Sequence, residues 1–165
     1  MFELNDYVVF GSTGVCQITE IINENFGTDT EREYYVLNPV HANSCTIYIP
    51  TDKEDANIRR IMTKDEIIEL VKVMPDIDGE WITDDQTRKA AFADMIQSCD
   101  PESLVKLTKM MYTRQKELEK DGKKLSNSDT DMMKKAEQVL HNEFALVLDI
   151  KLDQVVPFIL GQIKV

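Results

Sequence analysis

The stretch Ile61-Met62-Thr63-Lys64-Asp65-Glu66 decides the fold, because the spacing of apolar residues changes across it. Before it, apolar residues form short runs rich in β-branched and aromatic side chains, a pattern typical of strands. Within it, Thr63 and Glu66 form a capping box, in which each side chain bonds the other's free backbone amide at the start of a helix. We therefore predict a β-rich domain over residues 1–60 and a helical domain over residues 61–165.

The β-rich domain is expected to contain four or five short strands. Turn residues at 11–14, 25–28 and 38–44 separate the apolar runs, which lie at 7–10, 15–22, 33–37 and 46–49. Strands this short bury a core only if their sheet curls on itself. We predict a small antiparallel sheet bent into a half-open barrel.

The helical domain is expected to form a bundle of about five helices. Residues 83–86 repeat the capping box, Asp100-Pro101 pairs a cap with a first-turn proline, and Ser126 or Ser128 opens the next helix. A last apolar helix is expected around 155–160. Apolar residues recur at helical spacing in the two longest segments: Leu104, Leu107, Met111 and Leu118, then Met132, Ala136, Val139, Leu140, Phe144 and Val147. The predicted fold class is α+β.

Composition points to a globular chain without a membrane segment. The 165 residues carry a formal charge of −11 and are 42% hydrophobic and 30% charged. No apolar run approaches the ~20 residues that cross a bilayer, and the start has no basic segment before an apolar one. We expect a cytoplasmic protein. The wide spacing of Cys16, Cys45 and Cys99 fits a reducing compartment, and all three are expected to be buried.

Motifs for catalysis or cofactor binding are missing from the sequence, so we expect neither an enzyme nor a cofactor. GxGxxG, GxxxxGK[ST], GxSxG and HExxH do not occur. His41 and His141 have no second ligand at zinc spacing. The acidic stretch at 76–85 lacks the glycine and final glutamate of a calcium loop, so a solvated acidic loop explains it better than a cation site.

Several short motifs occur in a specific order over nearly the whole chain. In the first 60 residues they are 2–6, 8–10, 14–15, Ile18, Ile21, 34–37, 49–50 and 57–59. In the helical half they are Trp81 before a helix with Arg88 and Phe92, then 124–126, Asp129, 136–137 and 143–145. In this order the chain resembles the CarD family of bacterial transcription regulators, whose opening module is shared with transcription-repair coupling factor.

The resemblance implies a Tudor-like domain that binds the β subunit of RNA polymerase, and a helical domain that meets promoter DNA at the upstream edge of the melted bubble. By the same resemblance, Trp81 is a minor-groove wedge that helps to hold the open complex. The polymerase-binding residues would be Ile21, Glu24, Thr46, Ile47, Tyr48 and Ile49. An exposed strand edge suits such docking, because it offers backbone hydrogen bonds to a partner.

The charge distribution does not favour binding to free DNA. Residues 1–60 hold 4 basic and 10 acidic side chains, and residues 61–165 hold 15 and 20, so neither half resembles a free-standing DNA binder. Positions 106–124 nevertheless carry a local excess of four positive charges. The candidate DNA-binding residues are Trp81, Arg88, Lys89, Lys106, Lys109 and Lys116.

Two interpretations of the helical half stay open at this point. The basic residues form either a DNA-binding face or an ordinary solvated face, and Trp81 is either a wedge or a core anchor. The first hypothesis is a monomeric transcription regulator that bridges polymerase and promoter DNA. The alternative is a polymerase-binding adaptor whose acidic helical domain recruits a second protein instead of DNA.

Overall fold

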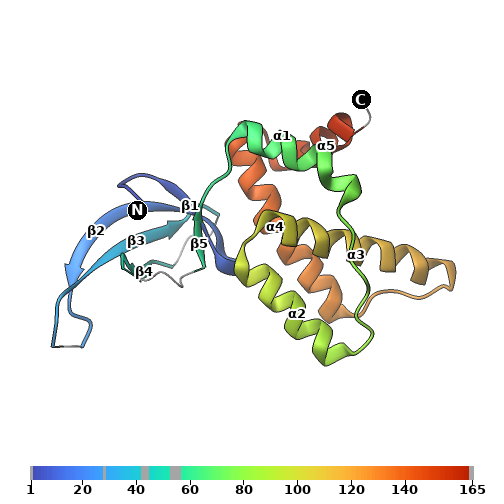
Figure 1. Ribbon diagram of the computed structural model, residues 1–165, viewed down its shortest axis with the longest axis horizontal. Helices are drawn as coiled ribbons and strands as arrows, with labels where there is room; N and C mark the ends of the chain where they lie inside the picture. The colour runs from blue at the N-terminus through green and yellow to red at the C-terminus, as the bar shows by residue number, and fades with distance from the viewer. Residues whose placement is uncertain (1, 28, 42–44, 53–56, 164–165) are drawn as a thin grey trace.

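The computed structural model describes residues 2–27, 29–41, 45–52 and 57–163 (Figure 1). The strands come first: β1 (Tyr7–Phe10), β2 (Gly14–Glu24), β3 (Arg32–Pro39), β4 (Ile47–Pro50) and β5 (Ile58–Arg60). The helices follow: α1 (Lys64–Val73), α2 (Asp85–Ser98), α3 (Pro101–Lys120), α4 (Asn127–Leu148) and α5 (Val155–Ile163). Three short 3₁₀ turns, η1 (Gly11–Thr13), η2 (Met74–Asp76) and η3 (Leu152–Gln154), complete the described elements. The predicted α+β class is confirmed.

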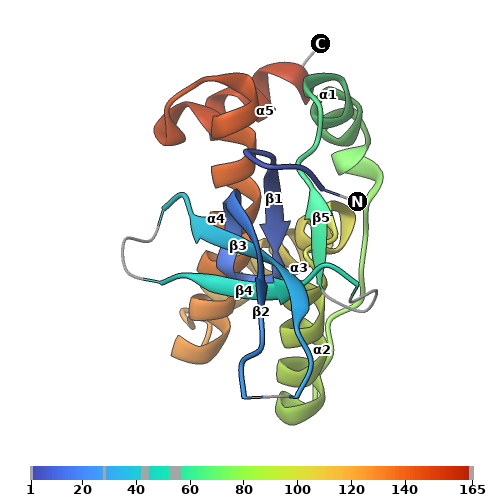
Figure 2. The ribbon, with the colours of Figure 1, turned by 90° about the vertical axis from the view of Figure 1, so that its left-hand side faces the viewer.

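The five strands form one antiparallel sheet in the order β4-β3-β2-β1-β5. Figure 2 shows β3 and β4 running across the direction of β1 and β5, so the sheet is strongly bent but does not close. Beyond an irregularity between Ile18 and Glu20, the last part of β2 no longer pairs with β1, and it projects with β3 away from the helices (Figure 1). The bent, half-open sheet expected from the sequence is therefore present, with β4 at one edge.

The sheet is buried on both of its faces where it meets the helices. Val8 and Val9 are adjacent in β1, so their side chains point to opposite faces of the strand. Both are fully buried, so both faces are covered here. Val8 packs in a core within the sheet with Ile18 and Leu37. Val9 packs instead in the large helical core, together with Phe144 of α4 and other apolar residues. Residues of both halves thus contribute to the large helical core, and the sheet keeps a second core of its own.

Local capping signals account for most of the helix starts. The Thr63–Glu66 capping box is present, and Asp100 and Ser126 cap α3 and α4 as predicted. The predicted box at 83–86 is wrong, because Asp84 caps α2 instead. Its carboxylate accepts hydrogen bonds from the Thr87 amide at 2.9 Å and from the Thr87 hydroxyl at 2.7 Å. An aspartate next to the threonine is the stronger cap at this position.

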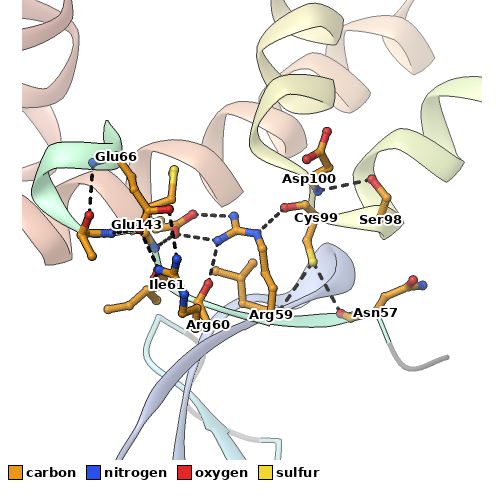
Figure 3. A network of polar contacts seen from close by, with 12 residues as sticks. Asn57, Arg59, Arg60, Ile61, Glu66, Ser98, Cys99, Asp100 and Glu143 are labelled. Carbon is orange, nitrogen blue, oxygen red and sulfur yellow. Dashed lines mark hydrogen bonds and ion pairs between the residues drawn. The ribbon is translucent and has the colours of Figure 1, made fainter. Parts of the chain in front are cut away.

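A buried ion pair fastens the sheet to the helices (Figure 3). The Glu143 carboxylate on α4 is 0% exposed and accepts two hydrogen bonds from Arg59 of β5, at 2.6 and 2.8 Å. It also accepts one from the Met62 amide at 2.7 Å. The third side of the Arg59 guanidinium donates to the Cys99 carbonyl, at the turn between α2 and α3, at 2.7 Å. Arg59 therefore ties β5 to two separate parts of the helical half, α4 and the α2–α3 turn, and Glu143 adds the Met62 amide to the same network.

The cysteines divide into two buried thiols and one exposed thiol. Cys16 and Cys99 are buried, and burial raises the pKa of Cys16 to about 12. The expectation that Cys45 is buried is wrong, because this residue precedes the edge strand β4 and is exposed. Among the helices in the described part of the chain, none is long and apolar enough to cross a membrane.

Candidate functional site

The predicted polymerase-binding residues do not share one edge or one face: Thr46, Ile47, Tyr48 and Ile49 lie at the β4 edge, whereas Ile21 and Glu24 lie on β2, on the other side of β3. Ile47 and Ile49 pair with Leu37 and Tyr35 of β3, and Ile21 pairs with Tyr35 from the other side. Paired residues share a face, so these isoleucines lie on the face that carries the sheet's own core. Ile49 is buried there, and its contribution to a contact would come from its backbone.

The opposite face of the same edge carries exposed aromatic side chains. Tyr48 points away from the face of Ile47 and Ile49, since neighbouring residues alternate along a strand. Its ring lies 5.2 Å from that of Phe26, which lies 4.9 Å from that of Tyr34. Tyr48 is 47% exposed and Phe26 is 53% exposed. We call these three residues, Phe26, Tyr34 and Tyr48, the aromatic cluster.

Phe26 and Tyr34 were not among the residues that the sequence analysis assigned to this site. The signal available for Phe26 was an aromatic residue inside a turn, where burial is not expected. The other two predicted residues lie around the cluster. Glu24 ends β2 as an exposed residue opposite Arg32, and the Thr46 hydroxyl donates to Asn38 at 3.4 Å just before β4. An open strand edge beside exposed aromatic rings is typical of a protein-docking surface.

The Trp81 segment, residues 77–83, forms the second candidate surface. It has no regular secondary structure and joins η2 to α2 along the side of α3 (Figure 1). At Gly79 it passes so close to α3 that an added Cβ would lie 2.5 Å from Met110 Sδ and 2.7 Å from Lys106 Cε. A side chain at this position would have to displace these two side chains, so the glycine lets the segment lie directly on the helix.

Lys109 holds the start of this segment and is not a free surface cation. Its ammonium donates to the carbonyls of Met74 at 2.8 Å, Pro75 at 3.1 Å and Ile77 at 2.5 Å. It also forms an ion pair with Asp78 at 3.6 Å. The prediction that Lys109 presents its charge on an exposed basic face is wrong, because its donors are already used within the protein.

Arg88 is also buried rather than exposed. Its side chain is 6% exposed and pairs with Asp129 at 3.0 Å and with Asp85 at 2.6 Å. The prediction that Arg88 lies on an exposed basic face is wrong, because its side chain points into the protein, towards Asp129 of α4. The remaining candidate lysines, Lys89, Lys106 and Lys116, are exposed.

Trp81 is half-buried, between the two alternatives drawn from the sequence. Its ring packs edge-on against Phe92 of the helical core, with the ring centres 6.1 Å apart. The guanidinium carbon of Arg88 lies 4.6 Å from the centre of the ring, and that of Arg114 lies 5.6 Å from it. Hollows of about 220 and 270 Å³ adjoin Trp81, and Arg114 lines both of them. The ring is thus supported from the core while part of it stays accessible.

Several of the carboxylates around Trp81 have partners within the chain. Asp78 pairs with Lys109, Asp84 caps α2, and Asp85 pairs with Arg88. These contacts offset part of the negative charge that the acidic stretch suggested. Among the residues that the structure describes, no three His, Cys, Asp or Glu side chains come together as a metal-binding group.

Two family models match the chain, one on each side of the Thr63 capping box. The CarD-like/TRCF RID domain, an RNA-polymerase-interacting module with a Tudor-like fold, matches residues 2–62. The CarD C-terminal domain matches residues 69–159, more than half of the chain. The search of curated proteins gives no match. The open five-stranded sheet followed by five helices, together with these two matches, shows that the chain belongs to the CarD family and is a transcription-associated protein that binds RNA polymerase.

Proposed function

We propose that the chain is a non-enzymatic regulator that binds the β subunit of RNA polymerase through its β4 edge and stabilises the promoter open complex through Trp81. The observation that carries the proposal is the placement of two surfaces on one body. The β4 edge and the aromatic cluster belong to the sheet, and the Trp81 segment lies on the side of the helices away from the sheet (Figure 1). The shared core and the Arg59–Glu143 pair hold them together.

Strand addition at β4 is the mode of polymerase binding that we propose. In the described residues, β4 pairs with β3 on one side and with no strand on the other. A partner strand would take its hydrogen bonds from the free side, while the exposed rings of Tyr48 and Phe26 would give specificity. The sheet core behind β4 keeps this edge in place.

The DNA contact that we propose is apolar, with local help from cations. A side chain that enters between base steps has to offset an unstacking cost of a few kcal/mol, and a tryptophan ring offers enough apolar surface for that. Arg114 beside the ring, with Lys106 on the same helix, would face the phosphates. Because the helical half is acidic overall, we expect it to bind DNA weakly without polymerase.

Binding to the isolated polymerase β subunit tests the first half of the proposal. Tyr48→Ala combined with Phe26→Ala should weaken binding at least about tenfold, because exposed aromatic anchors each contribute ~1–2 kcal/mol or more to an interface. Tyr112→Ala is the matched control, since Tyr112 is 46% exposed but lies on α3. Equal binding by the double variant and the control would contradict the proposed use of this edge.

A second candidate function, the polymerase-bound adaptor, is favoured by one apolar groove. This groove of about 510 Å³ lies between η2, α3, α4 and α5, and its apolar lining includes Val105, Leu140, Val156, Ile159 and Leu160. Val156 and Leu160 are about half exposed. If the helical half recruits a protein, Leu160→Ser should abolish the effect on transcription while Trp81→Ala leaves it intact. The opposite result is expected for a DNA-contacting protein.

A further inference from the structure

The Trp81 segment is held by side chains instead of by backbone pairing. Residues 77–83 belong to no helix or strand. Lys109 binds the carbonyls before Trp81, as described above. Arg88 binds the two carbonyls that directly follow Trp81, those of Ile82 at 2.9 Å and Thr83 at 3.4 Å. A segment without a hydrogen-bond ladder depends on such contacts for its position.

Arg88 also contacts the ring itself and is in turn fixed by acids. Its guanidinium lies over Trp81 at 4.6 Å, within the range of a cation–π contact. Asp129 of α4 accepts from Nε at 3.2 Å and from Nη2 at 3.0 Å, a two-pronged contact that sets the plane of the guanidinium. Asp85 accepts from Nη2 at 2.6 Å. The orientation of the ring therefore depends on α4, which is far from Trp81 in the sequence.

Core stability alone gives little reason for this arrangement. Burying an ion pair costs desolvation energy, and apolar residues of similar size often serve a core equally well. The pair lies beside Trp81 at the margin of the core, where it contacts both the ring and the adjoining backbone. The geometry of the Arg88–Asp129 pair therefore fits a role in orienting the Trp81 side chain.

We propose that Arg88, held by Asp129, is a positioning residue that orients Trp81 for insertion into DNA. This inference rests on the proposed DNA contact of Trp81 and adds how the contact is prepared. A ring that already has its bound orientation loses less conformational entropy on binding. Lysine cannot take the place of Arg88, because it lacks the planar fork that bonds Asp129 while covering the ring.

Fluorescence of the free protein tests the positioning directly, since Trp81 is the only tryptophan in the chain. Arg88→Lys and the gentler Asp129→Asn should make Trp81 more accessible to acrylamide and lower its fluorescence anisotropy. The matched control is Glu66→Gln, which breaks the exposed Arg60–Glu66 pair away from Trp81. Folding is checked by circular dichroism, and Asp129→Asn serves if Arg88→Lys does not fold. Unchanged quenching and anisotropy in a folded variant would overturn the inference.

A second experiment measures the lifetime of promoter open complexes at saturating concentrations of the protein. Asp129→Asn should reduce the lifetime gain about fivefold while binding polymerase normally, because an immobilised side chain accounts for ~1 kcal/mol of binding, which corresponds to about fivefold. A mobile Trp81 with an undiminished lifetime would overturn the positioning role. If Trp81→Ala itself leaves the lifetime unchanged, the proposed function fails, whereas the fluorescence arm still decides whether Arg88 orients the ring.

Discussion

Replacing Glu143 should loosen the whole molecule, because this carboxylate connects its two halves (Figure 3). Glu143 is fully buried, whereas the Arg59 side chain is 22% exposed. Glu143→Ala would remove three accepted hydrogen bonds and leave the guanidinium and the Met62 amide without their acceptor. Glu143→Gln would keep one acceptor oxygen but lose the charge.

The loss of stability depends on which buried groups lose their hydrogen-bond or ion-pair partner. Breaking a buried ion pair on one side costs ~3–5 kcal/mol. We expect Glu143→Ala to lie in the lower half of that range, since water reaches part of Arg59. Glu143→Gln should cost about 1.5–3 kcal/mol, the amount typical of hydrogen bonds to a charged group. Either loss is a large share of the ~5–15 kcal/mol by which a domain is stable.

Urea unfolding followed by circular dichroism measures these costs. With a slope of about 1–3 kcal/mol per molar urea, Glu143→Gln should lower the midpoint by roughly 1 M. Glu66→Gln is again the matched control, because it breaks an Arg–Glu pair whose side chains are 63% and 44% exposed. Exposed pairs contribute ~0–1 kcal/mol, so its midpoint should change little.

The reasoning would be refuted if the midpoints of Glu143→Gln and Glu66→Gln coincided. A double-mutant cycle with Arg59→Ala sharpens the test, because residues in direct contact should show a coupling energy of about 0.5–3 kcal/mol. A coupling near zero would mean that Arg59 and Glu143 stabilise the protein independently of each other.

Three further outcomes concern the acid stability, the thiols and the Trp81 segment of the protein. Hydrogen bonds from Arg60 and from the Thr63 amide lower the pKa of Glu66 from 4.5 to about 2, so the small stability that this exposed, solvent-screened pair contributes is complete above pH 4.5 and is lost as the pH falls towards 2. In acid titrations followed by circular dichroism, Glu66→Gln should therefore lose less stability over that range than the wild type, and an equal loss would contradict the assignment. Of the three thiols, exposed Cys45 alone should react quickly with a thiol reagent under native conditions, and bound polymerase should slow this reaction; fast modification of Cys16 or Cys99 would show that the core opens readily. Gly79→Ala should cost ~1–3 kcal/mol by overpacking against α3 and should shift Trp81 fluorescence, whereas a neutral variant with unchanged emission would show that the segment lies less closely on the helix.

Features set by short-range signals could be predicted from the sequence. The caps at Thr63, Asp100 and Ser126 depend on residues three positions apart, and all three are present. The box expected at Thr83 was wrong because the sequence offers a stronger cap one residue later. Strand β5 was not predicted as a separate element, since three residues with two arginines carry no strand pattern of their own.

The candidate site was harder to predict, because its contacts join distant residues. Arg88 meets Asp129 across 41 positions, and Lys109 meets the carbonyls of 74–77 across 32 to 35. Both cations look like surface residues in a local reading of the helices. The aromatic cluster likewise forms only when β4 pairs with β3 and Phe26, just beyond β2, packs against Tyr34 and Tyr48. Local sequence identified Trp81 as unusual, but only the packing shows what supports it.

The lifetime of the promoter open complex tests the central claim most directly. RNA polymerase on a linear promoter is challenged with a competitor, and the decay is measured with wild-type protein and with Trp81→Ala at concentrations that saturate the polymerase. We predict that the wild type lengthens the lifetime and that Trp81→Ala, although bound to polymerase, loses most of that effect, with Trp81→Phe recovering part of it. A lifetime that Trp81→Ala lengthens as much as the wild type would contradict the account.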